Sequence, residues 1–225
     1  MRILLVRHGQ STANAAGAVS SAAPGPDLTD LGREQATALA EALGDDRIDA
    51  VYASTLVRAQ QTAAPLAARL GLDVVVRDGL HEIEAGDLED RTDEEALRGY
   101  VLPLIAWAGG DLTASAPGAP DGHAFFERFD AAIADIVALH DGSADDATVV
   151  VVGHGAATRV WLGGRALNVD PEFTTSTEME NTGVIEVTGS PDVGWTVVSW
   201  QGAPVGVAAP NDPTGEALDE ALDED

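Results

Sequence analysis

Short apolar runs rich in β-branched residues alternate along this chain with longer alanine- and leucine-rich segments of helical period. Two of the runs, "RILLVR" at residues 2–7 and "ATVVVVGH" at residues 147–154, have almost no polar side chain in their interior. Strands of this kind are typical of parallel sheets whose two faces are covered by helices. The alternation therefore predicts an α/β fold, a three-layer sandwich with a mostly parallel central sheet and helices on both faces.

The other predicted elements follow the same alternation. Two further strands are expected at 49–54 and 72–77, and helices are expected within 29–44, 55–71 and 122–139. The runs "NTGVIEVTG" and "GWTVVSWQG" predict an antiparallel hairpin that closes the sheet. The segments 15–27 and 109–122 are rich in glycine, alanine, serine and proline, so we expect them to be loops.

Length and apolar content indicate one globular domain, because 225 residues with 45% hydrophobic side chains can bury a substantial core. We expect this single domain to cover residues 1–208. The sequence "NDPTGEALDEALDED" is acidic with few apolar side chains, so residues 209–225 are expected to form a disordered tail. The chain shows neither a membrane-length apolar run nor a secretory signal, and we expect a cytoplasmic protein.

The formal net charge of -26 restricts the partners of the chain. Nucleic acids and anionic membranes are bound chiefly through clustered basic residues, so neither is an expected partner. All twelve basic residues are arginine, so a bound anion must be held by guanidinium groups or backbone N–H groups. Cysteine is absent, which excludes disulfides, thiolate metal sites and a cysteine nucleophile.

Arginine and histidine occur where the predicted strands end. The first strand ends in Arg7 and His8, the helix after the second strand carries Arg58, and the long apolar strand ends in His154. Ligands of open α/β sheets bind outside the carboxyl ends of the strands. Two arginines, two histidines and the helix N-termini at this edge predict a binding site for a tetrahedral dianion such as phosphate.

These residues belong to motifs that resemble those of the histidine phosphatase superfamily, which includes the cofactor-dependent phosphoglycerate mutases. The resemblance runs from Arg2 to about Val187. "RHGQSTAN" is similar to the phosphate-pocket motif of the family, and "LTDLGREQA" is similar to a helix start. "ASTLVRAQQTA" resembles the block with the second phosphate arginine, "LHEIEAGDLED" the block with the acid, and "VVVGHGA" the block with the second histidine.

The resemblance implies a role for each residue that matches a motif. It implies that His8 is the nucleophile that accepts the phosphoryl group and that Glu82 is the proton donor. It also implies that three residues hold the equatorial phosphoryl oxygens, namely Arg7, Arg58 and His154. Further substrate contacts are expected from residues of the same motifs, namely Gln10, Asn14 and Gly155.

Physical chemistry supports these roles independently. A histidine attacks phosphorus only with an unprotonated ring nitrogen, and the charges of Arg7 and Arg58 are expected to disfavour protonation of His8. Fixed guanidinium groups can stabilise the charge on three phosphoryl oxygens, so we expect neither a metal ion nor a cofactor. Glu84 is the rival proton donor, and the family spacing before Gly86 selects Glu82.

The reaction expected from the sequence is hydrolysis of a small phosphorylated metabolite. A mutase must also hold a substrate carboxylate and a second phosphate, whereas the interval between Glu82 and His154 contains only the arginines Arg91, Arg98 and Arg128. This composition favours a phosphatase over a phosphoglycerate mutase. The mutase and a non-catalytic phospholigand-binding module are the alternatives, and the sequence does not distinguish a monomer from a homodimer.

Overall fold

The computed structural model describes residues 1–140 and 147–205, and within them one mixed sheet has the strand order β3-β2-β4-β1-β5-β6-β7. Parallel pairing joins β3 (Val74–Arg77), β2 (Ala50–Ser54), β4 (Thr148–Gly153) and β1 (Arg2–Arg7). Antiparallel pairing then adds β5 (Val184–Ser190), β6 (Gly194–Trp200) and β7 (Ala203–Pro204) beyond β1. The predicted hairpin is thus present as β5 and β6, and it lies at the opposite side of the sheet from β3.

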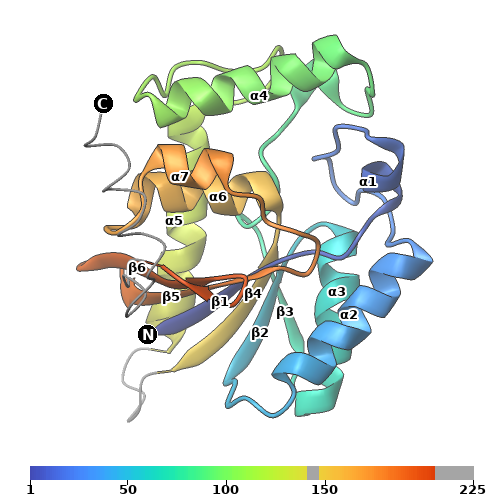
Figure 1. Ribbon diagram of the computed structural model, residues 1–225, viewed down its shortest axis with the longest axis vertical. Coiled ribbons are helices and arrows are strands. Elements are labelled where there is room, and N and C mark those ends of the chain that lie inside the picture. The colour runs from blue at the N-terminus through green and yellow to red at the C-terminus, as the bar shows by residue number, and fades with distance from the viewer. Residues whose placement is uncertain (141–146, 206–225) are drawn as a thin grey trace, which may run out of the picture.

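Helices cover both faces of the sheet (Figure 1). One face carries α2 (Asp30–Leu43) and α3 (Val57–Leu70). The opposite face carries α5 (Gly122–Leu139), α6 (Gly155–Arg165) and α7 (Pro171–Ser176). The shorter pieces α1 (Thr12–Ala16) and η1 (Gly86–Leu88) and the helix α4 (Glu94–Ala108) lie beyond one end of the sheet. The predicted three-layer α/β architecture is confirmed.

The central strands β1 and β4 are buried on both faces, as their apolar sequences predict. Their side chains alternate between the two core clusters because successive residues of a strand point to opposite faces. Ile3 and Val149 pack toward α5 and α6, whereas Leu4 and Val150 pack toward α2 and α3. Each of these four side chains is at most 2% exposed. This packing fixes the positions of β1 and β4, and at their carboxyl ends Arg7 of β1 pairs with Gly153 of β4.

Four helices were not expected from the sequence, namely α1, α4, α6 and α7. In α4 apolar residues occur on both sides of the helix, because Leu97, Leu102 and Ile105 remain between 42% and 55% exposed while Leu104 and Trp107 are buried. The expected loop at 15–27 begins inside α1, which ends at Ala16. The predicted acidic tail at 209–225 lies outside the described residues. Within the described part of the chain, no helix combines the length and apolar character needed to span a membrane.

Candidate active site

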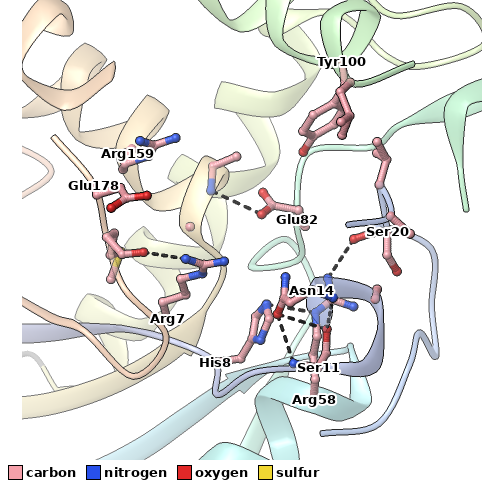
Figure 2. Close-up of a pocket in the computed structure, with 17 residues that line it drawn as sticks. Arg7, His8, Ser11, Asn14, Ser20, Arg58, Glu82, Tyr100, Arg159 and Glu178 are labelled. Atoms are coloured by element: carbon pink, nitrogen blue, oxygen red, sulfur yellow. Dashed lines mark hydrogen bonds between the residues drawn. The ribbon is translucent and has the colours of Figure 1, made fainter. Parts of the chain in front are cut away.

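A cavity of about 320 Å³ lies at the carboxyl ends of β1 and β4 (Figure 2). His8, which follows β1, and Arg58 of α3 are hydrogen-bonded to each other and line it together with the first turn of α6. Its polar and charged lining comes from six segments of the chain and includes Arg7, His8, Ser11, Asn14, Ser20, Arg58, Glu82, Tyr100, Arg159 and Glu178. Six of the eight predicted site residues therefore line the cavity, whereas Gln10 and His154 do not.

His8 directly follows β1 and is only 3% exposed. Its Nδ1 lies 2.7 Å from the carbonyl oxygen of Gly9, and its Nε2 lies 3.0 Å from Nε of Arg58. A carbonyl can only accept and a guanidinium can only donate, so Nδ1 carries the proton and Nε2 keeps its lone pair. Burial, followed by the charges of Arg58 and Arg7, lowers the pKa of His8 to about 3. The predicted effect of the arginines is thus present, but burial is the larger cause.

Arg58 links the two histidines from the first turn of α3. Besides its bond to His8, Nη2 donates to the Ser20 carbonyl at 2.9 Å and to Nδ1 of His154 at 3.3 Å. The other nitrogen of His154, Nε2, lies 2.7 Å from Oγ of Ser54, the last residue of β2. His154 is fully buried, and the rings of the two histidines lie 5.1 Å apart. The structure therefore places His154 behind Arg58 and His8 rather than on the wall of the cavity.

Arg7 and Gly155 meet where β1 and β4 end side by side. A β-carbon at Gly155 would lie 3.2 Å from Cδ and Nε of Arg7, so glycine leaves room for the guanidinium beside the first turn of α6. Nη1 of Arg7 donates to the carbonyl of Met179 at 2.6 Å. Burial lowers the pKa of Arg7. A partly buried guanidinium and the N-terminus of a helix thus face the same space, an arrangement suited to an anion.

Glu82 lies at the N-terminus of α6 (Figure 2). Its Oε1 accepts hydrogen bonds from the backbone N–H groups of Ala157 at 2.8 Å and Ile83 at 2.9 Å, and its Oε2 accepts one from Ala156 at 3.2 Å. The carboxylate thus satisfies two N–H groups that a helix leaves without partners. Since Glu82 also lines the cavity, it lies within the same site as His8.

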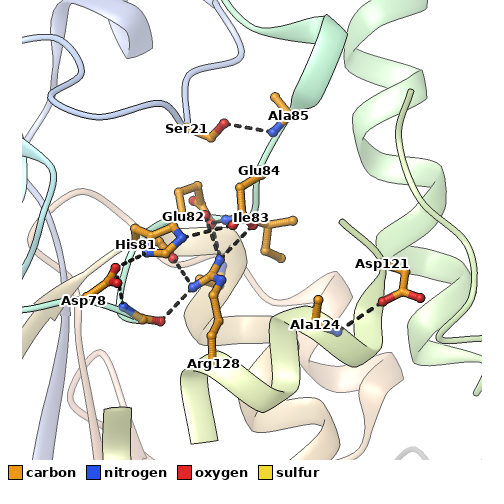
Figure 3. A network of polar contacts seen from close by, with 12 residues as sticks. Ser21, Asp78, His81, Glu82, Ile83, Glu84, Ala85, Asp121, Ala124 and Arg128 are labelled. Carbon is orange, nitrogen blue, oxygen red and sulfur yellow. Dashed lines mark hydrogen bonds and ion pairs between the residues drawn. The ribbon is translucent and has the colours of Figure 1, made fainter. Parts of the chain in front are cut away.

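The rival acid Glu84 is held in a separate polar network (Figure 3). It accepts hydrogen bonds from His81 at 3.0 Å and from Arg128 at 3.1 Å, and it does not line the cavity. Burial alone would raise the pKa of Glu84, but the bond to His81 and the charge of Arg128 outweigh burial and lower it to about 2. The geometry thus separates the two carboxylates and agrees with the choice of Glu82 from the family spacing.

Arg128 of α5 also binds the backbone of the segment that carries Glu82. Its guanidinium donates to the carbonyl oxygens of Gly79 at 2.7 Å, His81 at 2.9 Å and Glu82 at 2.9 Å (Figure 3). Its plane also lies over the ring of Phe125, with Cζ 5.2 Å from the ring centroid. Arg128 therefore fixes the position of the Glu82 backbone from outside the cavity.

The structure brings Asn14 to the cavity but not Gln10. Oε1 of Gln10 accepts from the Thr29 hydroxyl at 2.9 Å, so its side chain joins the loop to the start of α2. The backbones approach closely there, because a β-carbon at Gly9 would lie 2.5 Å from the carbonyl oxygen of Gly32. Asn14 instead lines the cavity while its Oδ1 accepts from the backbone and hydroxyl of Ser11. The prediction of Gln10 as a substrate contact is therefore not supported by its position.

Sequence reasoning missed several residues of the site. Arg159, Tyr100 and Glu178 line the cavity, and Ser54 contacts His154 behind it. Arg159 lies four residues after Gly155 in α6, a spacing that places both on one helix face and could have identified it. Tyr100 and Glu178 come from segments without a recognised motif. Within the described residues, no cluster of three or more histidine, aspartate or glutamate side chains has the arrangement of a metal site.

A sequence model of the histidine phosphatase superfamily (branch 1) matches residues 3–202. The chain belongs to the histidine phosphatase superfamily. The resemblance of the separate motifs to this superfamily is therefore confirmed over nearly the whole chain.

Relatives within the histidine phosphatase superfamily include both phosphatases and mutases by name. A PE-PGRS family protein of Mycobacterium tuberculosis is 40% identical over 221 residues, which cover 91% of this chain and 37% of that protein. A probable phosphoglycerate mutase of an Enterobacter species is 33% identical over 70% of this chain and 71% of that protein. The structure of a mycobacterial glucosyl-3-phosphoglycerate phosphatase with VO3 matches with a TM-score of 0.75 and 26% identity, over 89% of this chain and 98% of that one. The chain thus spans little more than a third of the first of these proteins.

Proposed function

We propose that this histidine phosphatase is a metal-independent phosphomonoesterase that acts on a small phosphorylated metabolite through a phosphohistidine at His8. The hydrogen bonding of His8 carries the proposal. Nδ1 donates to Gly9, so Nε2 has the free electron pair that attack on phosphorus requires. This nitrogen belongs to a residue that lines the same cavity as two guanidinium groups and the first turn of α6.

In the first step, Nε2 of His8 attacks phosphorus and the bond from phosphorus to the ester oxygen breaks. The Nε2 lone pair accepts from Arg58 in the structure, so a bound phosphoryl oxygen must first take over that N–H donor. Arg7, Arg58 and the N–H groups of α6 then stabilise the charge spread over the phosphoryl oxygens. The guanidinium groups replace the positive charge that a metal ion provides in other phosphoryl-transfer enzymes.

Glu82 supplies the proton that the departing alkoxide needs. Its carboxyl group lines the cavity at the start of α6, where it lies within the same site as the phosphoryl group on His8. In the second step, water attacks phosphorus and gives a proton to Glu82, and the bond from phosphorus to Nε2 breaks. Inorganic phosphate and neutral His8 are regenerated, so the cycle balances without an added reactant.

The positions of the arginines between Glu82 and His154 support hydrolysis rather than isomerisation. Arg91 pairs with Asp93 at the surface, Arg98 is exposed on α4, and Arg128 binds the segment behind Glu82. None of the three lines the cavity. Isomerisation is the second candidate function, because the Enterobacter relative is named a probable phosphoglycerate mutase. It predicts conversion between phosphoglycerate isomers that depends on a bisphosphate primer, without net release of phosphate.

Hydrolysis of 4-nitrophenyl phosphate in the presence of a chelator tests the proposal. We expect turnover by the wild-type chain and its loss, by at least about 10³-fold, in His8→Ala. His123→Ala is the matched control, because His123 is an exposed histidine at the start of α5. Full activity of His8→Ala would contradict the proposal, and so would binding of phosphate esters without turnover, which is the behaviour of a non-catalytic module. The cytoplasmic location and the choice between monomer and homodimer stay predictions.

A further inference from the structure

The segment 18–22 runs along the wall of the cavity without forming a helix or a strand. Three of its residues line the cavity, namely Ala18, Val19 and Ser20. The backbone N–H groups of such a segment need hydrogen-bond partners from other parts of the chain. The partners that hold this segment therefore determine where its polar groups lie relative to His8.

Glu89 holds the segment 18–22 through its carboxylate. Oε1 accepts hydrogen bonds from the backbone N–H groups of Ser21 at 2.9 Å and Ala22 at 3.1 Å. Oε2 accepts from the N–H of Ser21 at 3.0 Å and from the hydroxyl of Ser21 at 2.7 Å. The hydroxyl oxygen of Ser21 in turn accepts from the backbone N–H of Ala85 at 2.8 Å (Figure 3). One carboxylate thus satisfies two consecutive backbone N–H groups of the segment.

The backbones of the two segments are also joined directly. The N–H of Val19 donates to the carbonyl of Arg91 at 2.9 Å, and the N–H of Asp90 donates to the carbonyl of Val19 at 2.8 Å. Residues 85–91 follow Glu82 along the chain, so the part of the chain that carries the proposed proton donor also holds the segment 18–22. Among these attachments, the carboxylate of Glu89 contributes the largest number of hydrogen bonds.

The segment held in this way positions Arg58. Nη2 of Arg58 donates to the carbonyl of Ser20 at 2.9 Å (Figure 2), and Ser20 directly precedes a residue that Glu89 binds. A β-carbon at Gly25 would lie 2.8 Å from Nη1 of Arg58, so the backbone of the same loop also bounds the guanidinium there. Nε of the same group donates to Nε2 of His8 at 3.0 Å. Because a guanidinium is planar, a shift of the Ser20 carbonyl would also displace the donor at His8.

We propose that Glu89 is a positioning residue of the phosphoryl site, which holds the Ser20 carbonyl where this carbonyl orients Arg58 toward the phosphoryl group. The proposal rests on the function proposed above, because it uses the binding of phosphoryl oxygens by Arg58. The hydrogen bonds that Arg58 makes within the described chain do not include one to Glu89. Glu89 therefore acts on Arg58 through the backbone of residues 20–22.

The charge of Glu89 and its positioning role have opposite effects on phosphate binding. A carboxylate near the cavity repels a bound anion, so removal of the charge alone would strengthen the binding of phosphate. Loss of the hydrogen bonds that place the Ser20 carbonyl would instead weaken this binding, because Arg58 would lose its orientation. Glu89→Gln keeps the size of the side chain but removes the charge and one acceptor, so the sign of the change in affinity distinguishes the two effects.

Calorimetric titration with inorganic phosphate measures this change. We expect Glu89→Gln to raise the dissociation constant of phosphate about 10-fold and to lower kcat/KM by a similar factor. The loss of kcat/KM should be equal for 4-nitrophenyl phosphate and glycerol 3-phosphate, because Arg58 contacts the phosphoryl group that both share. Asp49→Asn is the matched control and should change neither quantity. Asp49 also accepts a hydrogen bond from a backbone N–H group, that of Thr148 at 2.9 Å, but it lies at the amino end of β4, away from the cavity.

Two further variants test whether Glu89 acts along this route. In an Arg58→Gln background, Glu89→Gln should cause no further loss of phosphate binding, because the side chain that it positions is already absent. Ser21→Ala removes one hydrogen bond to Glu89 together with the acceptor for Ala85, and we expect it to weaken phosphate binding about 3-fold. Ser21→Ala decides the question if Glu89→Gln does not fold.

Unchanged or tighter phosphate binding in folded Glu89→Gln would overturn the proposal, as would unchanged binding in Ser21→Ala where Glu89→Gln does not fold. An equal further loss in the Arg58→Gln background would also overturn it. The proposed function is tested separately, because phosphate binding requires no turnover. If hydrolysis of 4-nitrophenyl phosphate depends on His8 while phosphate binding does not depend on Glu89, only the positioning role is disproved.

Discussion

Arg58 donates a hydrogen bond of 3.0 Å from its Nε to Nε2 of His8, so a fixed cation holds the nitrogen that is proposed to attack phosphorus. The ring is fixed from the other side by the 2.7 Å contact of Nδ1 with the Gly9 carbonyl. The two contacts select one tautomer and one ring orientation before a substrate arrives. Such preorganisation lowers the reorganisation needed in the transition state.

His8 is expected to stay neutral from about pH 8 down to about pH 5, because burial and the neighbouring arginines lower its pKa to about 3. The ¹⁵N chemical shifts of its ring measure this, and a titration step between these limits would contradict it. The lowered pKa of His8 also affects the free energy of unfolding. The unfolded chain takes up a proton near the ordinary value of 6.5, whereas the folded chain does so near 3, so His8 reduces the free energy of unfolding as the pH falls through this window.

Arg128→Gln should lower kcat more for substrates with poor leaving groups than for 4-nitrophenyl phosphate. The substitution removes the bonds that position the Glu82 backbone, and a nitrophenolate needs no proton to depart. We expect a fall of about 10-fold for glycerol 3-phosphate, which corresponds to about 1.4 kcal/mol in the barrier. Arg91→Gln, at a surface pair with Asp93, is the control. Equal losses on both substrates would assign Arg128 to the stability of the fold instead.

Glu84→Gln is expected to lower the free energy of unfolding by about 1 to 2 kcal/mol at pH 7, because it weakens the contacts with His81 and Arg128. The pKa of Glu84 is lowered from 4.5 to about 2, so the carboxylate stabilises the fold above pH 4.5 and loses this effect as the pH falls toward 2. Urea unfolding at pH 7 and at pH 3 should therefore show a smaller difference between variant and wild type at the lower pH. A difference that does not depend on pH would contradict this explanation.

Ser54→Ala should destabilise the chain and impair catalysis together. It removes the hydroxyl 2.7 Å from Nε2 of the fully buried His154 and leaves that nitrogen without its partner, at a cost of about 1–3 kcal/mol. Urea unfolding gives the stability, and hydrolysis of 4-nitrophenyl phosphate gives the activity. Ser176→Ala provides the comparison, because its exposed hydroxyl only bonds carbonyls of its own helix, and less than about 0.5 kcal/mol is expected there. Similar losses in both variants would argue against a special role of Ser54.

The central part of the fold could be predicted because its sequence has a single explanation. The apolar runs of β1 and β4 fit only strands buried on both faces, and Thr29 and Gly44 mark the limits of α2. The helix α4 could not be predicted in this way, since it contains Pro103 and since Leu97 and Leu102 face solvent although the opposite side is buried. Helical period identifies a helix only where the apolar residues are confined to one face.

The site was predictable where its residues lie near strand ends or belong to the motifs that resemble those of the family. His8, Arg58 and Glu82 occur in motifs whose position along the chain also determines their position in space. Gln10 belongs to such a motif as well, but the close approach of the backbone to Gly32 turns its side chain toward Thr29. Tyr100 approaches the cavity through the packing of α4, and packing of this kind is not visible in the order of the residues.

The pairing of β1 with β4 joins residues 2–7 to residues 148–153. During synthesis, a nascent chain that still lacks β4 already contains His8, Arg58 and Glu82, but one side of β1 has no neighbouring strand and His154 has not yet been made. Contacts between such distant segments form late and slow the folding of a chain. Catalytic competence should therefore appear abruptly, only after synthesis has passed β4 and His154, and no N-terminal fragment that ends before β4 should show any.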